Sequence, residues 1–412
     1  MKASLFVILA GAIMFSCNEQ GPKQNPAERG LGAGKKDSAQ PKAAVAPSAT
    51  VTNKTTDDTV SFNRKFNDIA RYIAGMKQLP GSDLISLEKD TLWIKHAKNF
   101  DKAWEPLETK RLKPMRDWAA TELAEQHKQN LDVFYPLSGP DILHVNAFFA
   151  KAKHYHLYAL ERAGSLPDLK HMKTKEIDTY LNDVYTSLGD VFTKSYFITH
   201  KMLTDLQKQN VNGTVALICV FLVRSNYTVV NVKYCHLNDD GSDKPLNKDS
   251  AAVHTNDFVK VYFKNNVDSS AGIQMLTYMK CDLADGGLKE NKGLTAFINN
   301  MPVSVTYLKS ASYLLHYKFF STLRDDILSK SQTVLEDDTG IPFKSFEKGK
   351  WNVSLYGSYV KPVSDFSGVF QDDLMKAYHD STSVNKPKPL PFSLGYHWGT
   401  NSQNLIKAEH KG

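Results

Sequence analysis

Three short segments of the chain hold side chains that could act on a substrate or bind a metal. Asp141 follows Ser138-Gly139-Pro140, so a hydroxyl lies close to a carboxylate along the chain. His154 and His156 stand two residues apart, and Asp338 begins an Asp-Thr-Gly triplet. Paired carboxylates activate water by sharing a proton, a serine needs a neighbouring base, and two imidazoles bind zinc with further ligands. Each segment therefore has a chemical interpretation and a structural one.

The triplet at Asp338 is also found in aspartic proteases, which need two such triplets or a symmetric dimer. Only one is present, and it follows the acidic residues Glu336 and Asp337. The structural interpretation is a helix followed by a loop that ends at Gly340, with Asp338 bonding the turn. The chemical alternative makes Asp338 the acid/base carboxylate of a hydrolase.

The segment at Ser138 and Asp141 has no Gly-x-Ser-x-Gly nucleophile turn around its serine. A Ser-Gly-Pro-Asp run after a strand is typical of a turn into a helix, here over 142–149, with Ser138 or Asp141 as its N-cap. The chemical alternative makes Asp141 an acid/base group with a second carboxylate about 5–10 Å away, as in glycosidases.

The histidine pair lies in a predicted strand over 154–160, where His154 and His156 share one face. Zinc binding would need another ligand, for example His144 or Asp141, but the spacing does not demand one. The structural interpretation places the two imidazoles on the polar side of the strand, opposite a core face. We expect no cofactor, and keep His154 and His156 as the candidate metal ligands.

Aromatic rings beside polar groups are frequent in the C-terminal third, and such rings suit sugars or peptides. The candidates for ligand contact are Trp351, Tyr356, Tyr359 and Trp398. The structural alternative is that these rings belong to the core and the strands of a β-rich region.

Apolar residues at spacings of three and four predict helices over 62–76, 87–104, 108–129, 177–197, 307–328 and 370–378. Strands are predicted over 131–135, 154–160, 214–223, 227–236, 258–263, 275–281, 351–356 and 391–396. The run Val215–Val223 is almost wholly apolar, which predicts a central strand covered on both faces. Together these patterns predict an α+β fold: an N-terminal helical segment, then a mixed, mainly antiparallel sheet with packed helices.

Two stretches resemble a group of uncharacterised secreted or lipid-anchored bacterial proteins. They are 134–141 (FYPLSGPD) and 337–343 (DDTGIPF), with Trp351 and the run 356–359 (YGSY) downstream. The resemblance covers most of residues 130–400. It implies a shared fold and no particular activity.

Residues 1–17 resemble a bacterial lipoprotein signal. Lys2 precedes an apolar run over 5–15, which is shorter than the roughly 20 residues that span a bilayer. Ser16 stands before Cys17, although Met14 occupies a position where Leu is usual. The resemblance implies removal of residues 1–16 and attachment of palmitate and other acyl chains at Cys17. The alternative is ordinary secretion with cleavage elsewhere.

Residues 17–59 are rich in Gly, Pro, Ala, Ser and Lys and poor in large apolar side chains, which is typical of a disordered tether. The folded region is expected over 60–412, with a helical part over 60–205 and a β-rich part over 206–412. The net charge of +7 includes no dense Lys/Arg block, so nothing supports nucleic-acid binding.

These observations predict a non-catalytic protein of the cell envelope, lipid-anchored at the outer membrane or facing the periplasm. It would bind a glycan, a peptide or another envelope protein. The alternative is a hydrolase of envelope polymers that uses Asp141 or Asp338.

The lipid anchor predicts that Cys17→Ser loses membrane attachment, because the acyl chains supply about 0.8 kcal/mol per buried CH₂. The variant should stay uncleaved or enter the soluble fraction, and radiolabelled palmitate should mark only the wild type. Equal labelling of both proteins would contradict the assignment.

Overall fold

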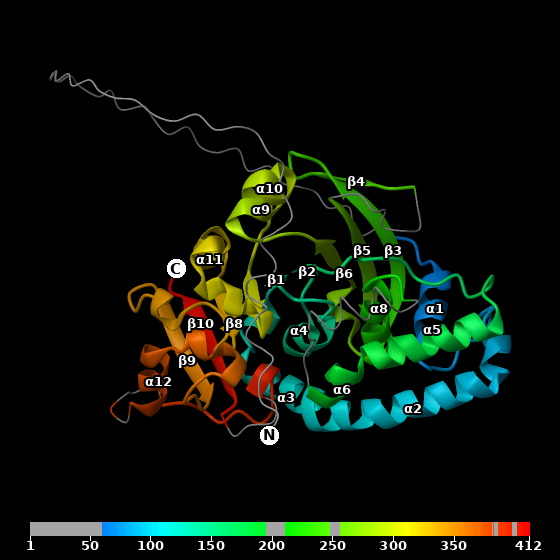
Figure 1. Cartoon of the computed structure of the whole chain (residues 1–412), viewed down its shortest axis with the longest axis horizontal. Helices are drawn as coiled ribbons and strands as arrows, with labels where there is room; N and C mark the ends of the chain where they lie inside the picture. The colour runs from blue at the N-terminus through cyan, green and yellow to red at the C-terminus, as the bar shows by residue number, and fades with distance from the viewer. Residues whose placement is uncertain (1–59, 195–210, 248–255, 381, 383–385, 398–401) are drawn as a thin grey trace, which may run out of the picture. The chain divides into compact units, whose positions relative to one another are not determined.

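The computed structural model describes residues 60–194, 211–247, 256–380, 382, 386–397 and 402–412. These residues belong to a compact unit, Thr56–Gly412, built around one ten-stranded sheet (Figure 1). Cys17 and Trp398 lie outside the described residues. No helix within the described ranges is both long enough and apolar enough to cross a membrane.

The sheet has the strand order β4-β3-β5-β6-β2-β1-β7-β8-β10-β9. Its strands are β1 Asp132–Pro136, β2 His154–Ala159, β3 Tyr227–Leu237, β4 Asp243–Pro245, β5 Asp257–Asn265, β6 Ile273–Lys280, β7 Val305–Leu308, β8 Thr333–Glu336, β9 Trp351–Gly357 and β10 Asn404–His410. The pairs β6–β2, β2–β1, β1–β7 and β7–β8 are parallel, and the remaining described pairs are antiparallel. The predicted α+β class and mixed sheet are therefore confirmed.

The parallel strands form the centre of the sheet and follow the order of a doubly wound fold. Numbered along the chain, β6-β2-β1-β7-β8 reads 3-2-1-4-5. The chain leaves β1 toward one side of the sheet and later returns to place β7 on the other side. In such sheets, ligands bind beside the carboxyl ends of the strands, at the point where the order reverses. Here that point lies between β1 and β7.

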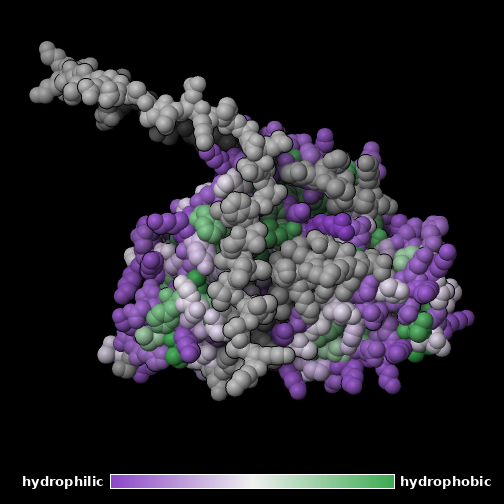
Figure 2. Space-filling model, viewed as in Figure 1, coloured by the Kyte–Doolittle hydropathy of each residue, from purple (hydrophilic) through white to green (hydrophobic). Residues whose placement is uncertain are grey.

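Helices cover both faces of this centre (Figure 1). Val133 and Tyr135 of β1 belong to one hydrophobic core, and Phe134 belongs to the other. The first core includes residues of α1 Arg64–Ile73, α2 Thr91–Leu107, α3 Lys113–Glu122, α4 Ile142–Phe148, α5 Thr174–Ser187, α6 Gly189–Lys194 and α8 Val215–Arg224. The second includes residues of α9 Asp285–Glu290, α10 Lys292–Asn300 and α11 Ser321–Lys330. On the face shown in Figure 2, hydrophilic residues dominate the described surface.

The prediction of a central strand at Val215–Val223 is wrong, because this run forms the helix α8. All nine of its residues are buried, between α1, α4 and β3. A helix that is enclosed on every side needs no polar face, so its sequence loses the 3.6-residue periodicity. A short apolar run of this kind fits either a buried strand or a buried helix. Cys219 consequently lies in α8 and not in a hairpin with Cys235, and both thiols are free.

Two further predictions near the C-terminus are corrected. The helix predicted over 307–328 begins only at Ser321, because Tyr307 and Leu308 complete β7 and are buried on opposite faces of the sheet. The strand predicted over 391–396 is not formed, and the last strand is β10. A short helix, α12 Asp372–His379, matches the one predicted over 370–378.

The burial of α8 predicts a large cost for truncating one of its side chains. Ile218 is fully buried, so Ile218→Ala should lower the free energy of unfolding by about 2–5 kcal/mol in urea denaturation. Val267 is 82% exposed, and Val267→Ala should change it by less than about 0.5 kcal/mol. Equal effects of the two substitutions would contradict the packing of α8.

Candidate functional site

Ionisable and hydroxyl side chains gather at the carboxyl ends of β1, β2, β7 and β8. This set is called the edge site, and it comprises Tyr135, Asp141, His144, Glu161, Lys309, Ser310, Glu336, Asp337, Asp338 and His397. Each is at most 5% exposed. Charged groups are rarely buried unless they are paired, so the pairing within the set decides what it can do.

Asp141 lies at the centre of the first half of the edge site. Its carboxylate accepts hydrogen bonds from Lys309 Nζ at 2.5 Å and Tyr135 OH at 3.1 Å, and lies 2.6 Å from His144 Nδ1. It also caps α4 by accepting from the His144 backbone N–H at 3.2 Å, which confirms the N-cap prediction. Burial alone would raise the pKa of Asp141, but His144 and Lys309 outweigh it and hold that pKa well below its usual value.

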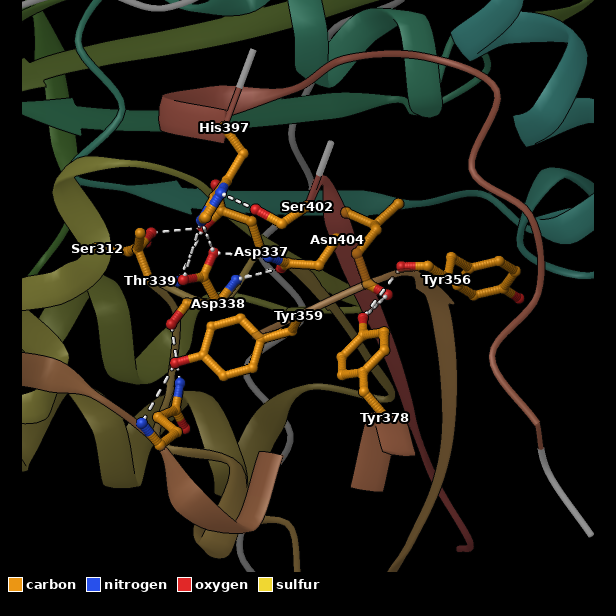
Figure 3. Close-up of polar contacts among 12 residues, drawn as sticks. Ser312, Asp337, Asp338, Thr339, Tyr356, Tyr359, Tyr378, His397, Ser402 and Asn404 are labelled. Atoms are coloured by element: carbon orange, nitrogen blue, oxygen red, sulfur yellow. Dashed lines mark hydrogen bonds and ion pairs between the residues drawn. The ribbon is translucent and has the colours of Figure 1, made fainter. Parts of the chain in front are cut away.

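Asp337 and Asp338 lie side by side at the end of β8. The triplet that begins at Asp338 therefore follows a strand, and the predicted preceding helix is wrong. Asp338 accepts from Asn404 Nδ2 at 2.9 Å and lies 3.0 Å from His397 Nε2 (Figure 3). Burial and the charge of Asp338 raise the pKa of Asp337 to about 6. The two neighbouring carboxyl groups thus differ in environment: Asp338 contacts an imidazole, whereas the pKa of Asp337 is raised toward neutrality.

The carboxyl groups beside His397 favour the protonated form of its imidazole. Burial alone would lower its pKa, but the hydrogen bond to Asp338 and the charges of Asp338 and Asp337 raise the pKa of His397 above its ordinary value.

Glu161 follows β2 and is 1% exposed. Burial raises the pKa of this carboxyl to about 7, although the backbone N–H groups of Leu160 and Glu161 partly oppose that rise. No described residue forms a hydrogen bond to its Oε1 atom. Glu161 is therefore a buried carboxyl group that changes between its charged and neutral forms near neutral pH.

Among the residues that the structure describes, several buried polar atoms at this edge have no hydrogen-bond partner. They are His144 Nε2, Glu161 Oε1, Tyr307 OH, Ser310 Oγ, Glu336 Oε1 and Asp337 Oδ2. Each such atom costs about 1–3 kcal/mol when it stays unpaired. Such atoms also occur elsewhere in the described part of the chain, but at the carboxyl edge a polar ligand or water would supply the missing partners.

The backbone is strained at the same place. Ser310 has φ 64° and ψ −89°, a conformation that a non-glycine residue rarely adopts. Gly395 lies against it, because a Cβ built at Gly395 would be 2.5 Å from Asp337 Oδ2 and 3.4 Å from Ser310 Oγ. Strain of this kind concentrates at functional sites. The two residues thus bring a hydroxyl, a carboxylate and bare backbone into close contact.

Of the residues selected from the sequence, Asp141 and Asp338 both reach the edge site. Ser138 instead donates to the Gly139 carbonyl oxygen at 2.8 Å, within the turn after β1. Sequence reasoning missed Glu161 and Lys309. Of these two residues, only Glu161 could have been selected from the sequence. It stands directly after a correctly predicted strand and about 20 residues beyond Gly139, which is the position of the ribose-binding acid in doubly wound sheets.

His154 and His156 lie at the other end of the strands. His154 Nδ1 is 2.6 Å from Asp132 Oδ1, and His156 Nε2 is 3.6 Å from the same oxygen. His144 and Asp141, the ligands suggested for zinc, lie beyond the opposite ends of β1 and β2. Among the residues that the structure describes, no group of three or more His, Cys, Asp or Glu side chains is placed to hold a metal ion.

The candidate aromatic residues occupy packed positions. Trp351 is 4% exposed, and Tyr356 and Tyr359 are fully buried. Tyr356 contacts the edge of the Trp118 ring at 4.9 Å between centroids, and Tyr359 belongs to a small core with Tyr378. Tyr356 and Tyr359 lie near the sheet end that carries Asp338 (Figure 3), whereas Trp351 pairs with His410 at the opposite end of β9.

Comparison of the chain with protein-family models, with curated proteins and with solved structures finds no match.

The ion pair at Asp141 predicts an asymmetric response to substitution. Lys309→Met should lower the free energy of unfolding by about 3–5 kcal/mol, because it leaves a buried carboxylate unpaired. The double variant Asp141→Asn/Lys309→Met should recover part of this loss, measured by urea denaturation. Strictly additive effects of the two single substitutions would contradict the pairing.

Proposed function

We propose that the edge site binds a nucleoside-type ligand without phosphate groups, in a protein held at a membrane by acylated Cys17. The anchor is supported by the signal at residues 1–17. The ligand is supported by the strand order and by the polar atoms at the edge site. The binding role expected from the sequence is kept, but its location moves away from Trp351, Tyr356 and Tyr359, which are buried.

The position of Glu161 carries this proposal. In doubly wound sheets, an acid at the end of the second strand, about 20 residues beyond the glycine turn, accepts hydrogen bonds from ribose hydroxyls. Glu161 follows β2, the second parallel strand, and its buried Oε1 atom has no partner within the described part of the chain. A vicinal diol would supply the two donors that this carboxylate can accept.

Phosphate does not suit the same site. Nucleotide-binding turns place several glycines and a free helix N-terminus against the phosphates. Here the turn after β1 contains Gly139 alone, and the carboxylate of Asp141 already accepts from the N-terminus of α4. The nearby cation, Lys309, is bound to Asp141. The other carboxyl groups at the edge therefore favour a neutral or cationic ligand over an anionic one.

Isothermal titration of the full-length protein with adenosine, S-adenosylmethionine and ATP tests this preference. Adenosine and the cationic S-adenosylmethionine should bind, and ATP should bind more weakly than either because its phosphates meet carboxylates. The proposal fails if none of the three binds or if ATP binds most tightly.

The raised pKa of Glu161 predicts a pH-dependent effect of Glu161→Gln. In the folded protein this pKa is about 7, against an ordinary 4.5, so the wild type loses stability as the pH rises through that interval. The glutamine variant escapes this loss, and should be more stable than the wild type at pH 8 by at most about 3 kcal/mol. Near pH 4 the two should be equal.

Thermal or urea denaturation across this pH range measures the difference. Glu125 is exposed, and Glu125→Gln serves as the matched control with no pH-dependent gain. Glu161→Gln should also weaken adenosine binding at least tenfold. A stability difference that does not change with pH would contradict the burial of an ionisable Glu161.

A further inference from the structure

Asp338 and His397 of the edge site and the neighbouring Ser402 form a continuous hydrogen-bonded chain (Figure 3). Ser402 Oγ lies 3.1 Å from His397 Nδ1, and His397 Nε2 lies 3.0 Å from Asp338 Oδ1. Asp338 and His397 are 2% and 3% exposed, whereas Ser402 is only half-buried. The chain therefore runs from a buried carboxylate, through a buried imidazole, to the hydroxyl of a half-buried serine.

The surrounding structure holds the carboxylate in place. Asn404 donates to Asp338 Oδ1 at 2.9 Å and accepts from the Asp338 backbone N–H at 2.7 Å. Gln371 donates to the Asp338 carbonyl oxygen at 2.8 Å. Asn404 begins β10, which pairs with β8, so Ser402, two residues before β10, and Asp338, two residues after β8, lie at the ends of two paired strands.

We propose that Ser402, His397 and Asp338 form a serine hydrolase relay that cleaves carboxylic esters. Such relays recur on unrelated folds and are defined by geometry and roles, not by sequence position. Ser402 is the nucleophile, His397 is the general base, and Asp338 is a positioning residue. In this relay the serine faces Nδ1 of the imidazole and the carboxylate faces Nε2, and either nitrogen can accept a proton when the other donates one.

The reaction balances without an additional reagent. Ser402 Oγ attacks the ester carbonyl carbon while its proton passes to His397 Nδ1. The bond to the alkoxy oxygen then breaks, and His397 returns the proton to the departing alcohol, which leaves an acyl group on Ser402. Water attacks this acyl group with His397 again accepting the proton, and the carboxylic acid leaves as Ser402 regains its hydrogen.

Asp338 stabilises the imidazolium that forms in each half of this reaction. The raised pKa of His397 reflects the same stabilisation in the resting protein. Glu161 takes no part in the relay, so the hydrolase proposal and the nucleoside proposal fail or succeed separately.

A fluorophosphonate probe tests the nucleophile in the full-length protein. Ser402 should displace fluoride and gain one phosphonate adduct, detected by intact mass and located by peptide mapping. Ser402→Ala should abolish the adduct, whereas Ser269→Ala, at an exposed serine elsewhere, should leave it unchanged. Absence of any adduct, or an adduct that persists in Ser402→Ala, would overturn the proposal.

Two further variants separate catalysis from folding. His397→Gln should slow labelling by at least about 100-fold, because general base catalysis contributes 10²–10⁴-fold. Asp338→Asn should shift the pH midpoint of labelling downward, since the carboxylate that raises the pKa of His397 is lost. An unchanged labelling rate in His397→Gln, or an unchanged midpoint in a folded Asp338→Asn protein, contradicts the assigned roles.

Discussion

A buried ion pair between Asp141 and Lys309 lies between β1 and β7, where the order of the parallel strands in the sheet reverses. Asp141 ends the turn after β1, and Lys309 directly follows β7, so the pair joins two adjacent strands at their carboxyl ends. A buried pair of this kind contributes little net stability, but breaking it leaves an uncompensated charge. The turn after β1 is therefore held against β7, and the other polar groups of the edge site are arranged around this junction.

The same burial has opposite consequences for different carboxyl groups of the edge site. Asp141 stays ionised because a cation and an imidazole contact it, whereas Glu161 and Asp337 have raised pKa values near neutrality. The edge thus holds both a permanent carboxylate and carboxyl groups that can exchange a proton. This combination suits a polar ligand, because such a site can accept and donate hydrogen bonds.

How well an element could be predicted depended on how its environment shaped its sequence. Strands β5, β6 and β9 were predicted within about three residues, because runs of β-branched and aromatic residues between polar segments are typical of strands. The helix α8 was not, because burial on all sides removed the polar positions that reveal helical spacing. Likewise the last two residues of β7, Tyr307 and Leu308, were predicted as the start of a helix, because apolar residues recur at helical spacing from Leu308 onward.

The sequence by itself determined the α+β class, a capped helix start at Ser138 or Asp141, and the candidacy of Asp141 and Asp338, since each rests on residues close together along the chain. Only the tertiary structure decided that Lys309, 168 residues away, neutralises Asp141, and that His397 meets Asp338. These contacts depend on the strand order β2-β1-β7-β8-β10, which brings segments far apart in the sequence to one edge of the sheet. Strand order arises from packing over the whole domain, and no local pattern of residue types encodes it.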